Sequence, residues 1–275
     1  MACTVCPACA GTPESAPLKR GKDQFLRCAT CKTQWREAGA VFDAYDASYF
    51  EERAHDDTES AVAKAKRQTF THFWRQIPES HRSRPILELG CSGGLALRAA
   101  LELKLDVHGF DVTEDILKLT DANGIPRERV TAGELRQLPA KTFGVAAFFD
   151  SFEHIPDPGA FLKEFMPYLA DDALILMVIP AADTLSNQFL GSLWPHYLPD
   201  HWIHYTLRGL DALLNPCGFS LQTSFYPKKQ VPSDMIRRHI NMRWPWLGKF
   251  VPGSLELGFN IGERGMIWKR SSATR

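Results

Sequence analysis

Four cysteines near the N-terminus have the type and spacing of a metal site. Cys6-Pro-Ala-Cys9 is followed by 18 residues and then by Cys28-Ala-Thr-Cys31. Each pair can sit on a tight turn and direct two thiolates at one point, so two such turns can close a tetrahedral site around Zn²⁺. Four protein ligands leave no open position, which predicts a structural metal and not a catalytic one. Cys3 has the same spacing relative to Cys6 and is an alternative ligand.

A glycine-rich turn in the middle of the chain has the features of a ligand site. Residues 88–94 read Glu-Leu-Gly-Cys-Ser-Gly-Gly and precede a run of strong helix formers over 95–104. Glycines allow the backbone to turn sharply and approach a ligand, and the first turn of a helix offers unpaired N–H groups. Asp111 ends the next apolar segment about 20 residues later, where a carboxylate can hydrogen-bond a ribose hydroxyl. A ribose-bearing ligand is therefore predicted.

The spacing of the glycines argues against a dinucleotide. That fingerprint needs glycines at positions 90, 92 and 95, but the chain has Ser92 and Leu95. A glycine turn that follows a strand and binds no ligand remains the alternative interpretation.

Alternating elements around this turn predict an α/β fold with a parallel sheet. Apolar runs predict strands at 86–89, 107–111, 129–132, 145–149 and 173–179, and helical patterns predict helices at 58–74, 95–104, 114–122 and 159–169. The strand ends then bring Asp111, Glu134 and Asp150 to one edge together with the turn. Ligands of open α/β sheets bind at that edge.

Three segments resemble one enzyme family. The turn at 88–94 resembles the acidic-x-Gly-x-Gly-x-Gly turn of class I S-adenosylmethionine-dependent methyltransferases, with Ser92 replacing the middle glycine. Residues 150–158, Asp-Ser-Phe-Glu-His-Ile-Pro-Asp-Pro, resemble the segment after the fourth strand of that class, especially in proteins similar to ubiquinone-pathway O-methyltransferases. Residues 204–219 resemble a further run of that group, and a zinc ribbon precedes the domain in some relatives.

The resemblance implies a Rossmann-like, seven-stranded methyltransferase sheet that binds S-adenosylmethionine. Gly90 and its neighbours would approach the methionine part, Asp111 the ribose, Glu134 or Leu135 the adenine, and Asp150 the methionine part. The full set of implied cofactor contacts is Glu88, Gly90, Cys91, Ser92, Gly94, Asp111, Val112, Glu134, Leu135 and Asp150.

The resemblance also directs attention to the base that a hydroxyl acceptor needs. A sulfonium is a strong methyl donor, so the protein mainly aligns the acceptor and removes its proton. Candidate catalytic residues at the cofactor edge are Glu153, His154 and His204, and His201 is also within reach. Alternatively, His154 only holds a loop, His204 caps the following helix, and positioning alone suffices.

Together these features predict a zinc ribbon over residues 1–40, a linker with an N-terminal helix over 41–84, and a methyltransferase domain over 85–275. Aromatic and basic residues at about 227–260 form a predicted insertion which, with 181–206, would bind the acceptor.

The predicted function is methyl transfer to a small-molecule hydroxyl of a glycan, polyketide or isoprenoid-type metabolite. An RNA methyltransferase that grips RNA through its basic ribbon is one alternative, although the formal net charge of zero argues against it. A non-catalytic scaffold of the same fold is another. The sequence has neither a signal-peptide pattern nor an 18-residue apolar run, which predicts a cytoplasmic chain without a transmembrane segment.

Overall fold

The computed structural model describes residues 5–20, 23–36, 61–232, 237, 256–260 and 262–271. Cys3, the predicted linker at 41–60 and most of the predicted insertion at 227–260 lie outside these residues. Within the described part of the chain, no helix is long and apolar enough to cross a membrane.

A seven-stranded sheet in the order β10-β13-β8-β7-β4-β5-β6 forms the centre of the protein. Strands β4 to β8 are parallel, and β13 and β10 are antiparallel to their neighbours at one edge. The strands are β4 (Ile86–Leu89), β5 (Val107–Asp111), β6 (Val130–Ala132), β7 (Phe143–Phe149), β8 (Leu169–Pro180), β10 (Phe219–Phe225) and β13 (Glu263–Arg270). This arrangement confirms the predicted Rossmann-like sheet.

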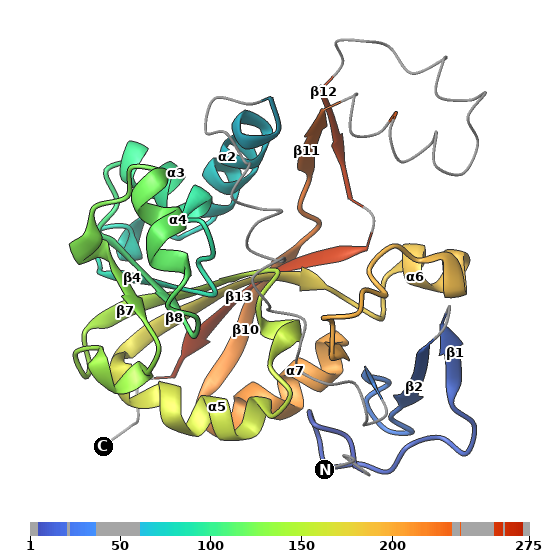
Figure 1. The fold of residues 1–275 in the computed structure, drawn as a ribbon. Helices are drawn as coiled ribbons and strands as arrows, with labels where there is room; N and C mark the ends of the chain where they lie inside the picture. Colours follow the sequence, from blue (N-terminus) through green and yellow to red (C-terminus); the bar gives the residue numbers. More distant parts are fainter. Residues whose placement is uncertain are drawn as a thin grey trace.

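Helices cover both faces of the sheet (Figure 1). They are α2 (Ala61–Trp74), α3 (Leu95–Glu102), α4 (Ile116–Ala122), α5 (Pro158–Phe165), α6 (Leu185–Leu190) and α7 (Leu207–Leu214). Two buried clusters result, one beneath α2 to α4 and one beneath α5 and α7. Every residue of β7, Phe-Gly-Val-Ala-Ala-Phe-Phe, is buried, as a central parallel strand requires.

Helix α5 ends earlier than the sequence predicts. It stops at Phe165, and Met166–Tyr168 form a 3₁₀ turn before β8 begins at Leu169. Pro167 lies in that turn and cannot continue an α-helix, because it lacks an N–H group. The prediction of helix up to residue 169 is therefore wrong by about one turn.

The N-terminal ribbon forms a second sheet in the order β1-β2-β3-β9. Its first three strands, β1 (Leu18–Arg20), β2 (Asp23–Arg27) and β3 (Gln34–Arg36), come from the ribbon. The fourth strand, β9 (Ile203–His204), comes from the segment between α6 and α7. The ribbon strands therefore lie against the end of the sheet that carries α6 (Figure 1).

The described C-terminal residues contain two strands outside the main sheet. β10 and β13 pair in antiparallel fashion within the main sheet, and residues 256–259 form a separate strand, β12 (Glu256–Phe259). It pairs with β11 (Lys229–Pro232) in a two-stranded sheet that projects from the main sheet (Figure 1). Gly262 separates β12 from β13 with φ at +109°, and the side chain of Asn260 accepts its N–H at 2.8 Å. This turn prevents one continuous strand.

Candidate active site and metal centre

A cavity of about 480 Å³ opens at the carboxyl ends of β4, β5 and β7, where the sequence predicts the ligand. Its volume is in the range of small-molecule sites. Seven of the ten predicted cofactor contacts line it, namely Glu88, Gly90, Cys91, Ser92, Asp111, Val112 and Asp150.

The glycines of the turn are required by its geometry. Gly90 has φ at +75°, and a Cβ there would lie 2.6 Å from the Cβ of Ser151. Gly94 has φ at +77°, precedes the first residue of α3, and would place a Cβ 2.9 Å from Ile125. A side chain at either position would clash with these neighbours and would be strained at a positive φ.

Ser92 adopts the backbone conformation for which a glycine is usually selected. Its φ is +47°, in the left-handed region. In that conformation its N–H donates to Oδ2 of Asp111 at 3.0 Å. The serine that departs from the family pattern therefore leaves the course of the turn intact, at a local conformational cost of about 1–2 kcal/mol.

Replacing Ser92 by glycine should stabilise the chain slightly. Relief of the left-handed strain exceeds the extra backbone entropy of glycine, about 0.5–1 kcal/mol. We expect Ser92→Gly to raise the free energy of unfolding by up to about 1 kcal/mol, measured by urea denaturation. A loss of stability would show that the serine side chain makes a contact that outweighs the strain.

Asp111 and Glu88 lie side by side as acidic groups at the cavity wall. Asp111 also accepts the N–H of Thr113 at 3.3 Å, and burial raises the pKa of its carboxyl while these backbone donors oppose the shift. Burial, and then the charge of Asp111, raises the pKa of Glu88 well above its usual range. Oε2 of Glu88 has no hydrogen-bond partner among the described residues. This buried polar atom fits a site that a polar ligand completes.

The remaining predicted cofactor contacts lie outside the cavity. Gly94 lies behind the turn, against Thr120 and Ile125. The side chain of Glu134 is exposed and pairs with Arg136, while Leu135 is buried in the core beneath the sheet. The structure therefore places neither of the two predicted adenine contacts at the cavity wall.

Helix α2 supplies one wall of the cavity. Lys66 and Phe70 line the cavity from this helix. Phe149 and Phe161 line it from the β7 and α5 side. Asn123 donates to the carbonyl of Gly93 at 2.7 Å and so holds the turn from α4.

Asp150 has a partner that sequence reasoning missed. It adopts φ at +49° at the end of β7, and its carboxylate pairs with the ammonium of Lys229 on β11. The same ammonium lies 2.5 Å from Oε1 of Glu263. Burial works to lower the pKa of Lys229, but the two carboxylates outweigh it and the net shift is upward. Only the fold brings this lysine to Asp150, since the two residues are 79 positions apart in the sequence.

His154 lines the cavity and is fixed in orientation. Its Nδ1 lies 2.8 Å from the carbonyl oxygen of Asp200, which can only accept. Nδ1 therefore carries the proton, and the lone pair of the neutral ring is on Nε2. The ring of His201 meets it edge to face, with centroids 4.8 Å apart.

Glu153 lies behind His154 and does not line the cavity. Its side chain is fully buried, and neither carboxylate oxygen has a hydrogen-bond partner among the described residues. Burial, and then the charge of Asp150, raises the pKa of Glu153 well above its usual range. Glu153, His154 and His201 each offer one ligand atom. These three atoms lie within 4.8 Å of one another, close enough to bind one cation.

The structure places His204 away from the cavity. The side chain is fully buried, and Nε2 donates to the carbonyl of His196 at 2.8 Å. The interpretation of His204 as a helix cap is wrong, since Thr206 caps α7 by accepting the N–H of Gly209 at 3.0 Å. His204 instead packs against Phe25 of the ribbon.

His204 should make stability depend on pH. Burial lowers its pKa to about 3 in the folded chain, so on acidification the unfolded chain binds a proton that the folded chain does not. Between pH 7 and pH 5 this group should cost about 2 kcal/mol of stability, because the unfolded pKa is about 6.5. His204→Gln retains a donor for the His196 carbonyl and should lose about 2 kcal/mol less over that interval in urea denaturation. Equal losses in both proteins would contradict this.

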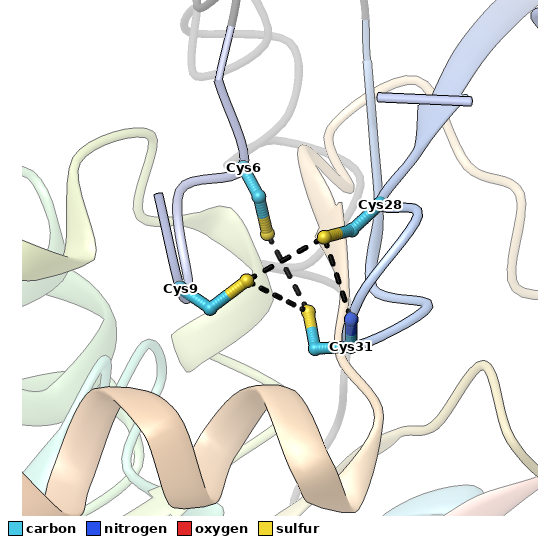
Figure 2. Close-up of side chains that lie close together, drawn as sticks. All are labelled: Cys6, Cys9, Cys28 and Cys31. Carbon is cyan, nitrogen blue, oxygen red and sulfur yellow. Dashed lines mark hydrogen bonds between the residues drawn. The ribbon is translucent and has the colours of Figure 1, made fainter. Parts of the chain in front are cut away.

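The four predicted zinc ligands converge on one point (Figure 2). Sγ of Cys9 lies 3.4 Å from Sγ of both Cys28 and Cys31, and Cys6 and Cys31 are 3.6 Å apart. A tetrahedron with Zn–S bonds of 2.3 Å has edges of about 3.8 Å. None of the described cysteines forms a disulfide. The thiols therefore suit a tetrahedral ion.

Two equivalent turns carry these ligands. Cys6 N–H donates to the carbonyl of Gly11 at 2.8 Å, and Cys28 N–H donates to the carbonyl of Thr33 at 2.9 Å. The residue after each second cysteine, Ala10 or Lys32, adopts a positive φ. Repetition of one backbone pattern in both halves explains how each pair directs two sulfurs at the same point.

Comparison with known proteins identifies the family. The sequence profile of a family described as "Methyltransferase domain" matches residues 50–224. The chain belongs to this family. Together with the seven-stranded sheet, the match confirms the predicted class I S-adenosylmethionine-dependent methyltransferase.

Curated relatives of this methyltransferase match over a shorter segment. Ubiquinone biosynthesis O-methyltransferase of Bordetella avium is 26% identical over 95 residues, which are 32% of this chain and 39% of the relative. The protein of the same name from Paraburkholderia phymatum is 29% identical over 79 residues, 26% of this chain and 34% of the relative. The chain thus spans about two fifths or less of the relatives that it matches.

Solved structures share the fold at low identity. Magnesium protoporphyrin IX methyltransferase from Synechocystis, with bound SAH, has a TM-score of 0.55 and 15% identity, covering 83% of this chain and 97% of that chain. A complex of the Haloferax volcanii Trm112 methyltransferase activator with a methyltransferase gives a TM-score of 0.58 and 14% identity, with 83% and 98% covered.

Proposed function

We propose that this methyltransferase transfers a methyl group from S-adenosylmethionine to a hydroxyl oxygen of a small molecule. The observation that carries the proposal is that the glycine turn, Asp111 and His154 all line one cavity. A donor site and a candidate base therefore face the same enclosed volume. The O-methylation named for the curated relatives supports an oxygen as the acceptor atom.

The residues at the turn would hold the cofactor. Asp111 has its carboxylate at the cavity and can accept from ribose hydroxyls, while the backbone from Gly90 to Gly93 leaves room for close approach. Asp150 pairs with Lys229 through Oδ2 on the other side, and its Oδ1, which has no hydrogen-bond partner among the described residues, suits a cationic amino group. When bound, S-adenosylmethionine supplies an electrophilic methyl group.

His154 is proposed as the base that accepts the proton of the acceptor hydroxyl at Nε2. The bond from Nδ1 to the Asp200 carbonyl fixes the required tautomer, because the carbonyl has no proton to give. His204 and the buried Glu153 are not proposed as bases, since neither lines the cavity.

The walls of the cavity favour an apolar acceptor. Phe70, Phe149 and Phe161 line it together with Ile155 and Pro156. Apolar walls with a few polar groups favour a ring or hydrocarbon over a heavily hydroxylated sugar. We therefore propose a polyketide or isoprenoid-type hydroxyl in preference to a glycan.

The contacts of the ribbon argue against the RNA alternative. Arg20 donates to the hydroxyl of Tyr197, and Arg36 pairs with Asp23. Arg27 and Lys32 both pair with Glu14. These basic side chains are engaged within the protein, whereas a phosphate-binding surface presents them outward.

We propose a structural zinc ion at the four cysteines. We also propose a division of the chain into ribbon, linker and methyltransferase domain, with boundaries at residues 40 and 84.

The proposed reaction can be tested with methyl-labelled S-adenosylmethionine. The zinc-loaded chain is incubated with a panel of phenolic, prenylated and glycosidic alcohols, amines and RNA, and the products are analysed by mass spectrometry. We expect the label on the oxygen of a phenolic or prenylated compound. Label on nitrogen, on RNA or on no compound of any class, despite binding of the cofactor, would refute the proposal.

A further inference from the structure

The sheet of the zinc ribbon is completed by a strand of the methyltransferase domain. Gln34 and Trp35 of β3 pair with His204 and Ile203 of β9. The ladder extends by one more bond, since the N–H of Arg36 donates to the carbonyl of Trp202 at 2.9 Å. Backbone hydrogen bonds thus join the ribbon directly to residues 202–204.

The hydroxyl of Tyr197 forms hydrogen bonds with side chains of β1, β3 and α6 beside this ladder. Tyr197 donates to Oε1 of Gln34 at 2.8 Å. Its hydroxyl accepts from Nε of Arg20 on β1 and from Nδ2 of Asn187 on α6, each at 2.9 Å. The ring also packs against Phe25 of β2, with centroids 5.2 Å apart. One side chain of the 194–206 segment therefore contacts all three ribbon strands.

The second cysteine turn is bound to the start of α7. Thr206 donates its hydroxyl to the carbonyl of Cys31 at 2.6 Å, and the same hydroxyl caps α7. A Cβ at Gly209 would lie 2.0 Å from Oγ1 of Thr33, which shows how closely the helix approaches the turn. Cys31 and Leu210 belong to one buried cluster.

The same segment holds His154 on its opposite side. The N–H of Trp202 donates to the carbonyl of Glu153 at 3.0 Å, and the carbonyl of Asp200 accepts from His154. His201 packs its ring against His154. Residues 198–206 are therefore a layer with the cysteine turns on one side and the acceptor side of the cavity on the other.

We infer that the metal-bound ribbon positions His154 through residues 197–206, with Tyr197 and Thr206 as the positioning residues. In this arrangement the ribbon supports one wall of the active site. A change at the metal centre therefore alters the acceptor side of the cavity. Residues 86–94 form β4 and the cofactor turn, and we expect this segment to respond little to the ribbon. The inference rests on the proposed function only for the role of His154.

Hydrogen exchange of the full chain tests this coupling, with zinc bound and after its removal by a chelator. We expect removal to speed amide exchange by at least tenfold in residues 198–206 and 152–157, and to change exchange in 86–94 by less than twofold. Binding of S-adenosylhomocysteine, measured by calorimetry, should change by less than threefold. Unchanged exchange at 152–157, a loss of protection throughout the domain, or a purified chain without zinc would overturn the inference.

A variant that leaves all four cysteines in place gives a second test. Tyr197→Phe removes the shared hydroxyl but keeps the ring, whereas Tyr226→Phe removes a hydroxyl from an exposed tyrosine and is the matched control. With zinc bound, Tyr197→Phe should speed exchange at 198–206 and 152–157 by about threefold to tenfold, and the control should not. Equal exchange in both variants would overturn the role of Tyr197. Failure of the zinc-loaded chain to bind S-adenosylhomocysteine would instead refute the proposed function and leave the exchange comparison valid.

Discussion

Replacing Asp111 by alanine is expected to weaken the binding of S-adenosylmethionine by about 100-fold or more. A hydrogen bond to a charged group contributes about 1.5–3 kcal/mol, and each 1.4 kcal/mol is a factor of ten. Asp111 can bind ribose hydroxyls at the cavity, and it also accepts the N–H of Ser92 and so holds the turn. Both effects act in the same direction. Calorimetric titration with S-adenosylhomocysteine measures the change.

A matched control distinguishes the loss of a contact in the cavity from the loss of a negative charge nearby. Glu134→Ala removes a carboxylate that the sequence predicts beside the adenine, but whose side chain the structure places outside the cavity and paired with Arg136. We expect its affinity to stay within twofold of the unchanged protein. Circular dichroism checks that both variants fold. Equal losses in Asp111→Ala and Glu134→Ala would contradict the location of the site.

Replacing His154 by asparagine is expected to lower kcat by about 10²–10⁴-fold. An asparagine amide can reproduce the donor of Nδ1 to the Asp200 carbonyl, but it has no atom equivalent to the basic Nε2. The variant therefore removes the proposed base while it keeps the loop anchored. Turnover is measured with labelled S-adenosylmethionine and the acceptor identified by the product assay.

A second variant gives this prediction a second readout. His154→Ala, which removes both the base and the anchor, should be at least as slow. If His154→Asn retains turnover within tenfold while His154→Ala does not, the residue only anchors the loop and positioning suffices for the reaction.

The sequence predicted the elements whose residue pattern follows from their own burial or from a single strand-turn-helix unit. Central strands such as Phe143–Phe149 are wholly buried, so they form apolar runs that the sequence reveals directly. The turn at 88–94 was also predicted, because its glycines and the spacing to Asp111 are set by one strand-turn-helix unit. Ser92 shows the limit of the pattern, since its positive φ keeps the turn without a glycine.

Features that depend on distant segments could not be predicted in the same way. Lys229 meets Asp150 only because β11 returns over the end of β7. His204 was an attractive candidate base by residue type, but its pairing with Gln34 directs it to the ribbon and away from the cavity. Leu135 follows a strand end, as an adenine contact would, yet its side chain is buried in the core. In each case tertiary packing, and not local sequence, decides the environment.

The central claim is that S-adenosylmethionine binds at the turn between Glu88 and Leu95 with Asp111 beside it. A calorimetric titration of the folded chain and of Gly90→Ala with S-adenosylhomocysteine tests it most directly. The account predicts one molecule bound per chain with Kd below about 100 µM, or about −5.5 kcal/mol. It also predicts loss of most of that affinity in Gly90→Ala, where the added Cβ would lie 2.6 Å from Ser151. No binding to the unchanged chain, or equal binding to both proteins, would contradict it.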